Sequence, residues 1–444
     1  MNDLDTLTCQ NTTASFANYF LAKCGTEANE TSMLIFALFI GFITLLRLWL
    51  AWRQIRYVSV HKQAVPDIFV NKISLDAHQK AADYACAKAR FSMIDHIISA
   101  GFLLWLTLGG GFNWMVTYFF TSETYSLFFI TLILFACIFV ISTVISLVVD
   151  YYRVFILEEK FGFNRSTLKL WLADQLRGIL LSLIIEFPLI LLAVFFIDRF
   201  IESWWLWLWL VLIGFNLLMS AAYPKFIAPL FNKFIPLNDP ELYGKTKKLL
   251  NDNQFTIDKI YVMDGSRRSS HGNAYFTGFG SAKRIVFFDT LLQTLSHDEI
   301  IAVLAHELGH LKRRHIWKMF IAFALLAFVF FFVLYELSTM PLFYSALNIY
   351  WPLIPVMLLL FMQLLPFVLF PLKPILSLLS RKNEYEADAF AAQQVPAECL
   401  ISGLVKLFGE NASTLTPDPI YSMVYDSHPS AMDRIARLEK LKSQ

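Results

Sequence analysis

The sequence predicts a mainly α-helical protein that crosses a membrane seven times and carries a small α/β domain with a metal site. Three observations lead to this fold class. The 444 residues are 57% hydrophobic and only 16% charged, whereas soluble domains carry about a quarter charged residues. Seven apolar runs each approach the ~20 residues that a membrane-spanning helix needs. A His-Glu-x-x-His sequence lies at 306–310, at the end of a hydrophilic block.

The first 32 residues are polar and do not begin with the basic segment of a cleaved signal peptide, so we expect segment 1–32 to precede the first span. Tryptophan and tyrosine border several of the apolar runs, as they do at membrane interfaces. The spans are expected at 33–52, 97–119, 125–149, 179–197, 203–222, 316–338 and 351–372.

The distribution of lysine and arginine predicts the orientation. Basic residues are concentrated in the connections 53–96 and 150–178, whereas 120–124 and 339–350 contain none. Because basic loops stay on the cytoplasmic side, both connections are expected there, with segment 1–32 outside. Spans one to five then occupy 33–222 and spans six and seven occupy 316–372. The domain at 223–315 and the tail 373–444 share the cytoplasmic side.

Charge and cysteine content limit the partners. The net charge is +2, and without a basic stripe no nucleic-acid partner is expected. The five cysteines show no Cys-x-x-Cys spacing, which argues against a thiolate metal site. Cys9 and Cys24, on the predicted outer side, are compatible with a disulfide and equally with two free thiols.

The block 223–315 reads as an α/β domain. Strands are expected at 259–265, 273–280 and 284–290, where β-branched and aromatic residues alternate with glycine breaks. Ser296 followed by Glu299 forms the signature of a capping box, which starts a helix. The apolar run after it leads into His306, so the His-Glu-x-x-His unit is expected on a helix.

Two histidines four residues apart share one face of a helix. His306 and His310 can therefore bind one zinc ion, and one zinc per chain is expected. Glu307 is turned by about 100° from His306, which lets it act as general base on a water at the metal. The alternative, a chance pair of histidines, is disfavoured by the capped helix.

A catalytic zinc has three protein ligands and a water, so a third ligand is needed. A predicted helix at 380–393 offers Glu384, Glu386 and Asp388. Glu384 and Asp388 share a face, with Glu386 nearly opposite. We predict that Glu384 binds the metal and that Asp388 orients a ligand histidine. Ordinary charges on a solvated helix are the alternative.

His428 is the only histidine after His315. It can donate a hydrogen bond to a developing oxyanion, although a loop histidine beside a proline turn is the simpler interpretation of the residue by itself. Arg434 follows on an expected terminal helix, and we expect it to support the metal ligands.

Three segments together resemble a known family. They are AHELGH (305–310), NEYEADAFA (383–391) and YSMVYDSHPSAMDRIARL (421–438). The chain resembles the type I CAAX prenyl proteases, which are integral-membrane zinc metalloproteases. Residues 158–175 and 267–292 resemble that family too, so the likeness covers nearly the whole chain.

The resemblance implies a fold of seven helices around a water-filled chamber in the membrane. It also implies roles for individual residues, and it favours the oxyanion role of His428. The implied zinc ligands are His306, His310 and Glu384, with Glu307 as base, Asp388 beside the ligands, and Asn273, Ala274, Tyr275 and Phe276 in an edge strand along the substrate.

We therefore expect a membrane zinc endopeptidase that removes C-terminal residues from prenylated CAAX-type peptides. Its partners would be a peptide or protein substrate and the lipid bilayer, in a bacterial inner membrane or an endoplasmic reticulum membrane. One alternative is a quality-control protease with no prenyl requirement. Another is a channel, transporter or scaffold with a structural zinc, but such a site is closed by four protein ligands and needs no general base.

Overall fold

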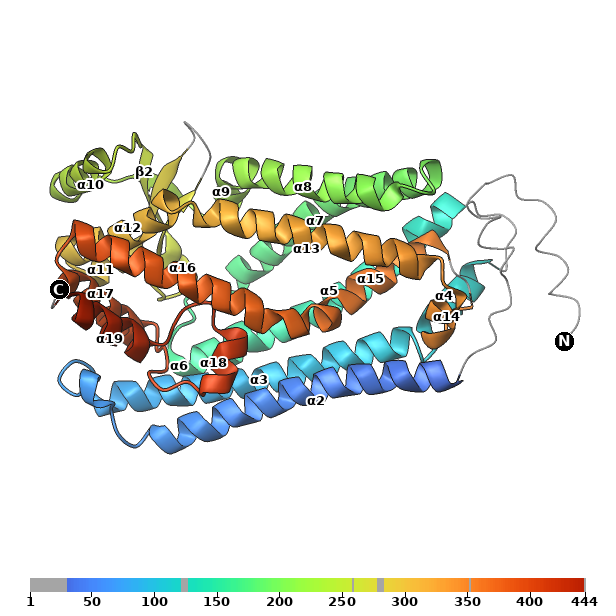
Figure 1. Ribbon diagram of the computed structural model, residues 1–444, viewed down its shortest axis with the longest axis horizontal. Coiled ribbons are helices and arrows are strands. Elements are labelled where there is room, and N and C mark those ends of the chain that lie inside the picture. The colour runs from blue at the N-terminus through green and yellow to red at the C-terminus, as the bar shows by residue number, and fades with distance from the viewer. Residues whose placement is uncertain (1–29, 121–126, 258, 278–282, 351–352, 443–444) are drawn as a thin grey trace, which may run out of the picture.

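The computed structural model describes residues 30–120, 127–257, 259–277, 283–350 and 353–442. Cys9 and Cys24 lie outside the described residues. Long helices run side by side along the molecule, and a small sheet with several shorter helices gathers at one end (Figure 1). We call this the sheet end. Helix α2 begins at the opposite end.

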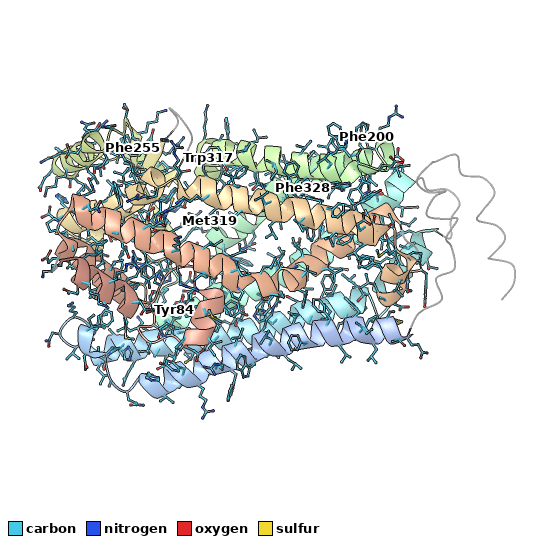
Figure 2. The ribbon with its side chains drawn as sticks, viewed as in Figure 1. Tyr84, Phe200, Phe255, Trp317, Met319 and Phe328 are labelled. Carbon is cyan, nitrogen blue, oxygen red and sulfur yellow. The ribbon has the colours of Figure 1, made fainter. Side chains whose placement is uncertain are left out.

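Seven helical segments of the described chain are long and apolar enough to cross a membrane, which confirms the predicted number. Figure 2 illustrates one of them: Trp317 lies near the sheet end of α13 (His315–Ser338), and Phe328 lies further along it. The seven segments are Glu30–His61, Leu75–Leu106, Phe129–Phe161, Leu168–Arg199, Trp204–Phe231, His315–Ser338 and Pro355–Gln394.

The first two spans differ from the prediction. Helices α2 (Glu30–His61) and α3 (Leu75–Leu106) continue far into residues 53–96, which were expected as a connection. The span expected at 97–119 is broken, because α3 ends at Leu106 and a separate helix α4 (Gly111–Phe120) follows. Gly110 adopts a left-handed φ of 74°, and a Cβ at Gly109 would lie 2.8 Å from the carbonyl oxygen of Trp105. The glycines of this turn therefore end the helix.

The middle spans are joined by short irregular helices. Helix α5 (Leu127–Tyr152) passes through a π-helical turn, η2 (Arg153–Glu158), into α6 (Glu159–Phe161). Helix α7 (Leu168–Arg199) starts at Thr167, whose side chain accepts a hydrogen bond from Leu170 N. Helix α8 (Trp204–Ala222) continues through η3 (Tyr223–Ile227) and α9 (Ala228–Phe231) towards the sheet.

Among the described residues, the sheet has four strands in the order β1-β2-β4-β3. Strands β2 (Lys259–Met263), β3 (Ala274–Thr277) and β4 (Arg284–Phe288) fall where they were predicted. Strand β1 (Phe234–Pro236) was missed because it has only three residues. Strands β2 and β4 are parallel, and β3 pairs antiparallel to β4 at the edge of the sheet. In the sequence, helix α10 (Pro240–Asp252) connects β1 to β2, and the short helix η4 (Gly265–Arg267) follows β2.

One hydrophobic core fills the sheet end and draws on both hydrophilic parts of the chain. It includes residues of α11 (Asp289–Thr294) and α12 (His297–Lys312). The later helices α16 (Lys373–Gln394), α17 (Ala397–Glu410) and α19 (Ala431–Lys442) contribute as well. Buried members are Ile285, Phe287, Ile300, Leu304, Leu308, Phe390, Leu400, Ile435 and Leu438. Residues 373–442, the described part of the tail, therefore pack as part of the same unit as the sheet.

The last two spans form a hairpin that returns to this core. Helix α13 leads through α14 (Pro341–Ala346) into α15 (Ile354–Val368). A 3₁₀ turn, η6 (Phe370–Leu372), then joins α15 to α16. Because α16 continues the seventh span, Glu384 lies on a direct extension of a membrane helix. Helix α18 (Pro419–Tyr425) precedes the loop that carries His428.

Two of the hollows that the described residues line differ in polarity. One, of about 1170 Å³, is lined by many polar side chains, among them Arg47, Asp95, His96, Asp150 and Lys373. Such groups at membrane depth require water or protein partners, so this hollow has the polarity of the chamber implied by the resemblance. The other, of about 510 Å³, lies among α7, α8, α13 and α15 and is almost wholly apolar apart from Glu186.

Candidate metal centre

Helix α12 is anchored at its first turn. Ser296 and Glu299 form the predicted capping box: Ser296 Oγ accepts from Glu299 N, and Glu299 Oε2 accepts from Ser296 N at 2.8 Å. Glu299 also accepts hydrogen bonds from Ser402 Oγ at 2.6 Å and Lys406 Nζ at 2.8 Å. The helix that carries the histidines is thereby tied to α17 before it reaches them.

Helices α12 and α16 cross in close contact. A Cβ added at Gly309 would lie 3.0 Å from Ala387 Cα and 3.2 Å from its carbonyl oxygen. A Cβ at these distances would be tighter than nine in ten real Cβ contacts, so the glycine favours this close approach. The crossing point lies between Glu384 and Asp388 in the sequence of α16, so both carboxylates are held against the His-Glu-x-x-His face of α12.

The close crossing brings the candidate ligand atoms of three residues together. His306 Nε2 lies 3.2 Å from His310 Nε2 and 3.4 Å from Glu384 Oε2. His310 Nε2 lies 3.3 Å from Glu384 Oε1. In the described part of the chain, these residues form the one group of His, Cys, Asp and Glu side chains close enough to share an ion. They are the three residues chosen from the sequence.

The donor set fits a zinc ion. Zinc bound to imidazole and carboxylate at ~2.0–2.1 Å in tetrahedral geometry separates neighbouring ligand atoms by roughly 3.3 Å, which matches the three distances. Glu384 is only 5% exposed, and its Oε2 has no hydrogen-bond partner among the described residues. A buried carboxylate oxygen without a partner is costly, and a cation at this point would satisfy it.

Asp388 and Arg434 support His306 from behind. Asp388 Oδ1 lies 2.8 Å from His306 Nδ1, and Arg434 donates to both Asp388 oxygens at 2.9 and 2.6 Å. All three side chains are buried. Burial alone lowers the pKa of His306, but the hydrogen bonds to Asp388 and Glu384 outweigh it and raise this pKa to about 9. The carboxylates of Asp388 and Glu384 therefore make His306 a stronger base, which can bind either a proton or a metal ion.

Glu307 faces a cavity of about 400 Å³ whose lining also includes His306 and Glu384, two of the three proposed ligands. Burial raises the pKa of Glu307 above its ordinary value. A carboxylate with a raised pKa is a better proton acceptor near neutral pH. Apolar side chains from α12 and α17 line much of the remaining wall: Val303, Leu400, Leu404, Leu407 and Phe408.

His428 lies at the rim of the same cavity. Its Nδ1 is 2.8 Å from Glu384 Oε2, yet the ring is not directed to donate to that oxygen, and 64% of the side chain is exposed. Arg381 holds the preceding loop by donating to the carbonyl oxygens of Ser422, Met423 and Asp426. His428 is therefore close to the proposed metal ligands while most of its side chain is exposed.

The predicted substrate strand is only partly in the cavity. Asn273 lines it, and the Asn273 carbonyl accepts from Phe288 N at 3.0 Å. Ala274, Tyr275 and Phe276 form the edge strand β3 but are not among the described residues that line the cavity.

Asn411 supports the start of this strand. Its side-chain oxygen accepts from Gly272 N at 3.1 Å, and its amide donates to Gly272 O at 3.4 Å. This residue was missed by sequence reasoning, because a contact across 139 residues leaves no local signal.

Comparisons with known proteins agree with this architecture. Residues 54–233 match the family model for the CAAX prenyl protease N-terminal region with five membrane helices, and residues 236–442 match that of peptidase family M48. CAAX prenyl protease 1 of Saccharomyces cerevisiae is 34% identical over 421 residues, covering 88% of this chain and 91% of the yeast protein. A CAAX prenyl protease 1 homolog of Arabidopsis thaliana is 33% identical, covering 90% and 96%.

A solved structure is similar throughout. The crystal structure of Ste24p from S. mikatae superposes with a TM-score of 0.84 at 33% sequence identity, covering 92% of this chain and 99% of that one. The similarity therefore extends over the membrane helices as well as the sheet end.

Proposed function

We infer the function from one premise, which is that this chain belongs to the CAAX prenyl proteases of peptidase family M48. It is a multi-pass membrane metallopeptidase that acts on peptides. We propose that its metal is one zinc ion per chain, bound by His306, His310 and Glu384. The spacing of the two histidine nitrogens and the two Glu384 oxygens, with contacts of 3.2 to 3.4 Å, is the observation that carries the proposal.

The residues around this centre suggest a separate role for each in catalysis. When bound, zinc supplies a Lewis acid that polarises the scissile carbonyl and lowers the pKa of a water towards neutrality. Glu307 takes the proton from the attacking water and passes it to the leaving amine. His428 donates a hydrogen bond to the carbonyl oxygen as negative charge develops on it. Asp388 and Arg434 keep His306 in one tautomer and one orientation.

The edge strand suggests how a substrate is held. In the described part of the chain, β3 pairs with β4 along one edge and no strand pairs with its other edge, which leaves that edge for an extended peptide. We propose that Asn273, Ala274, Tyr275 and Phe276 line up the substrate backbone by strand addition. Asn273 is the member of this set that reaches the cavity of the metal centre.

We propose that the substrates are prenylated and end in a CAAX-type sequence. The isoprenoid of such a peptide is attached to the cysteine at the cleavage point, so an apolar space is needed near the metal. The apolar hollow of about 510 Å³ includes Leu376 of α16. Leu376 lies eight residues before Glu384, or ~12 Å along a helix. Burial of an isoprenoid there would contribute about 0.8 kcal/mol per methylene-sized group.

We further propose that segment 1–32 is extracytoplasmic and that the sheet end, with 223–315 and 373–444, is cytoplasmic. The basic residues of 53–96 and 150–178 support this orientation. A bacterial inner membrane and an endoplasmic reticulum membrane both satisfy it.

One experiment separates this proposal from its nearest alternative. Purified full-length protein is given the same CAAX peptide in farnesylated and unmodified forms, with Glu307→Gln as the control. Metal-dependent cleavage that requires the farnesyl group supports the proposal. Equal cleavage of both forms would instead support a quality-control protease with no prenyl requirement. The third alternative, a scaffold with a structural zinc, does not fit a member of a peptidase family.

A further inference from the structure

The two ligand histidines are supported in different ways. A histidine that binds a metal through one ring nitrogen needs a hydrogen-bond partner at the other, which fixes its tautomer and orientation. For His306 this partner is the carboxylate of Asp388. For His310 it is another imidazole: His310 Nδ1 lies 3.0 Å from His315 Nδ1. His315 Nε2 in turn lies 3.1 Å from Glu386 Oε2.

A break between two helices produces this contact. In a continuous helix, residues five apart are separated by about 140° and do not share a face. Here α12 ends at Lys312, Arg314 adopts a left-handed φ of 56°, and α13 begins at His315. The turn folds His315 back beneath His310, where its side chain is only 3% exposed.

The hydrogen positions in this chain of contacts follow from the metal. If His310 Nε2 faces the metal, its proton is on Nδ1 and is donated to His315 Nδ1. His315 then carries its own proton on Nε2 and donates it to the Glu386 carboxylate. Every nitrogen has one role, and the negative charge of Glu386 stabilises the whole arrangement through the intervening ring.

We propose that His315 and Glu386 are positioning residues for the metal ligand His310. Together they form a relay that fixes the ring of His310 and strengthens it as a ligand. The proposal rests on the proposed function only in that His310 binds the metal. His315 is then more than a packing residue at the start of α13. Glu386 was excluded as a ligand because it points away from Glu384, and the proposal gives it a role of its own.

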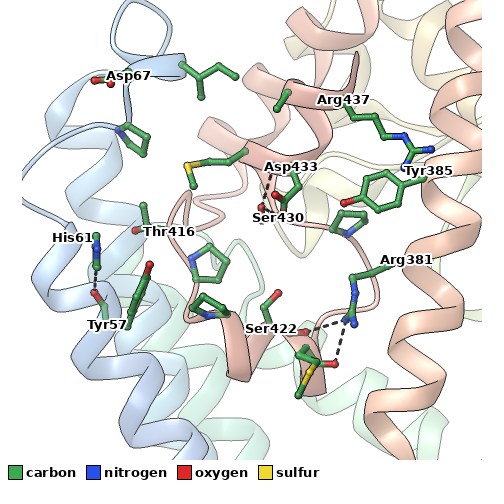
Figure 3. Close-up of a pocket in the computed structure, with 18 of the residues that line it drawn as sticks. Tyr57, His61, Asp67, Arg381, Tyr385, Thr416, Ser422, Ser430, Asp433 and Arg437 are labelled. Carbon is green, nitrogen blue, oxygen red and sulfur yellow. Dashed lines mark hydrogen bonds between the residues drawn. The ribbon is translucent and has the colours of Figure 1, made fainter. Parts of the chain in front are cut away.

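The relay ends at a groove. Glu386 is 34% exposed and is within 3.5 Å of Lys318 Nζ. It belongs to the lining of a hollow of about 1620 Å³ between α2 and the helices α16, α18 and α19. Figure 3 shows this hollow, with Tyr385 and Arg381 of α16 on one wall and Tyr57 and His61 of α2 on the other. His310, whose side chain is 21% exposed, is thus linked through one imidazole to a carboxylate that meets solvent.

The test uses zinc affinity of the full-length protein, measured by chelator competition, and starts from four single variants. His315→Phe keeps the ring volume and removes both hydrogen bonds. His315→Asn retains an acceptor close to the position of Nδ1 but does not reach Glu386. Glu386→Gln removes only the charge. Lys318→Ala, the matched control, leaves His315 and Glu386 in place.

We expect His315→Phe to weaken zinc binding by about 10- to 100-fold, the usual effect of removing such a partner. His315→Asn and Glu386→Gln should show smaller losses, and Lys318→Ala almost none. Adding Glu386→Gln to His315→Phe should cause no further loss, because Glu386 acts only through His315. The absorption spectrum of the cobalt-substituted protein should change in His315→Phe and be restored towards wild type in His315→Asn.

Two results would overturn the proposal: wild-type zinc affinity in His315→Phe, or an effect of Glu386→Gln that persists undiminished in the His315→Phe background. Glu384→Ala distinguishes a failure of the relay from a failure of the metal centre itself. If Glu384→Ala abolishes zinc binding while His315→Phe does not weaken it, the centre stands and the relay is wrong. If Glu384→Ala binds zinc as tightly as wild type, the ligand set is wrong.

Discussion

Gly309 of α12 packs directly against the backbone of Ala387 of α16, so that a Cβ at position 309 would lie 3.0 Å from Ala387 Cα. The contact lies one residue before His310, the second of the proposed ligand histidines, and three residues after Glu384. The distance between the two helices, and with it the size of the metal site, is therefore limited at this point by backbone rather than by side chains.

Gly309→Ala should weaken the metal site. The added methyl group must push α12 and α16 apart, which in a packed core costs about 1–3 kcal/mol. Thermal stability and zinc content of the purified variant should both fall. Gly244→Ala is the control, because a Cβ at Gly244 in α10 meets nothing within 4 Å. That exchange should be neutral or stabilise the protein by up to ~1 kcal/mol; equal effects of the two variants would contradict the account.

Arg434→Met should destabilise the protein strongly. Arg434 is paired with Asp388, and the two side chains are 8% and 1% exposed. Removal of one partner leaves the other charge buried and uncompensated, which costs about 3–5 kcal/mol. The double variant Arg434→Met/Asp388→Asn should lose less unfolding free energy than the sum of the losses in the two single variants. Additive losses, measured by unfolding of the three variants, would show that the pair is not coupled.

The stability of the metal-free protein should fall between about pH 6.5 and 9. The folded-state pKa of His306 is about 9, whereas an unfolded histidine titrates near about 6.5. A folded-state pKa above the unfolded one gives stabilisation that is complete below about pH 6.5 and is lost as the pH rises through about 9. Zinc takes the place of this proton, so the zinc-loaded protein should lack the decline. If the melting temperatures of the metal-free and zinc-loaded forms changed with pH in parallel, the raised pKa of His306 would not be the cause of the decline.

Asn411→Ala should impair substrate binding without loss of metal. Asn411 fixes both backbone polar groups of Gly272, next to Asn273 at the start of β3. Loss of these hydrogen bonds costs about 1–3 kcal/mol, and the loosened strand should raise KM for a peptide substrate roughly in proportion. Zinc content should equal that of wild type. An unchanged KM would mean that the strand edge does not hold the substrate.

The local parts of this molecule could be predicted from the sequence, because local rules determine them. The capping box of Ser296 and Glu299 and the four-residue spacing of His306 and His310 need no information from outside their helix. Glu384 was selected over Glu386 by helical phase alone, and the structure brings Glu384 to within 3.4 Å of both histidines.

The features that could not be predicted from the sequence depend on breaks between helices and on contacts between residues far apart in the chain. The glycines at 109–111 divide an apolar run that is long enough to span, and hydrophobicity does not register that break. His315 comes beneath His310 only because Arg314 reverses the chain. Asn411 reaches Gly272 across the fold. Each of these features depends on tertiary structure, and none produces a periodic pattern of hydrophobic residues from which it could be predicted.

The central claim, that Glu307 is the general base of a metal site formed by His306, His310 and Glu384, is tested most directly with Glu307→Gln. Zinc content and the rate of cleavage of a farnesylated CAAX peptide would be measured on the same preparation, beside wild type. The account predicts one zinc per chain in both proteins and a loss of about 10²–10⁴-fold in the cleavage rate of the variant. A zinc-loaded variant that cleaves at nearly the wild-type rate would contradict it.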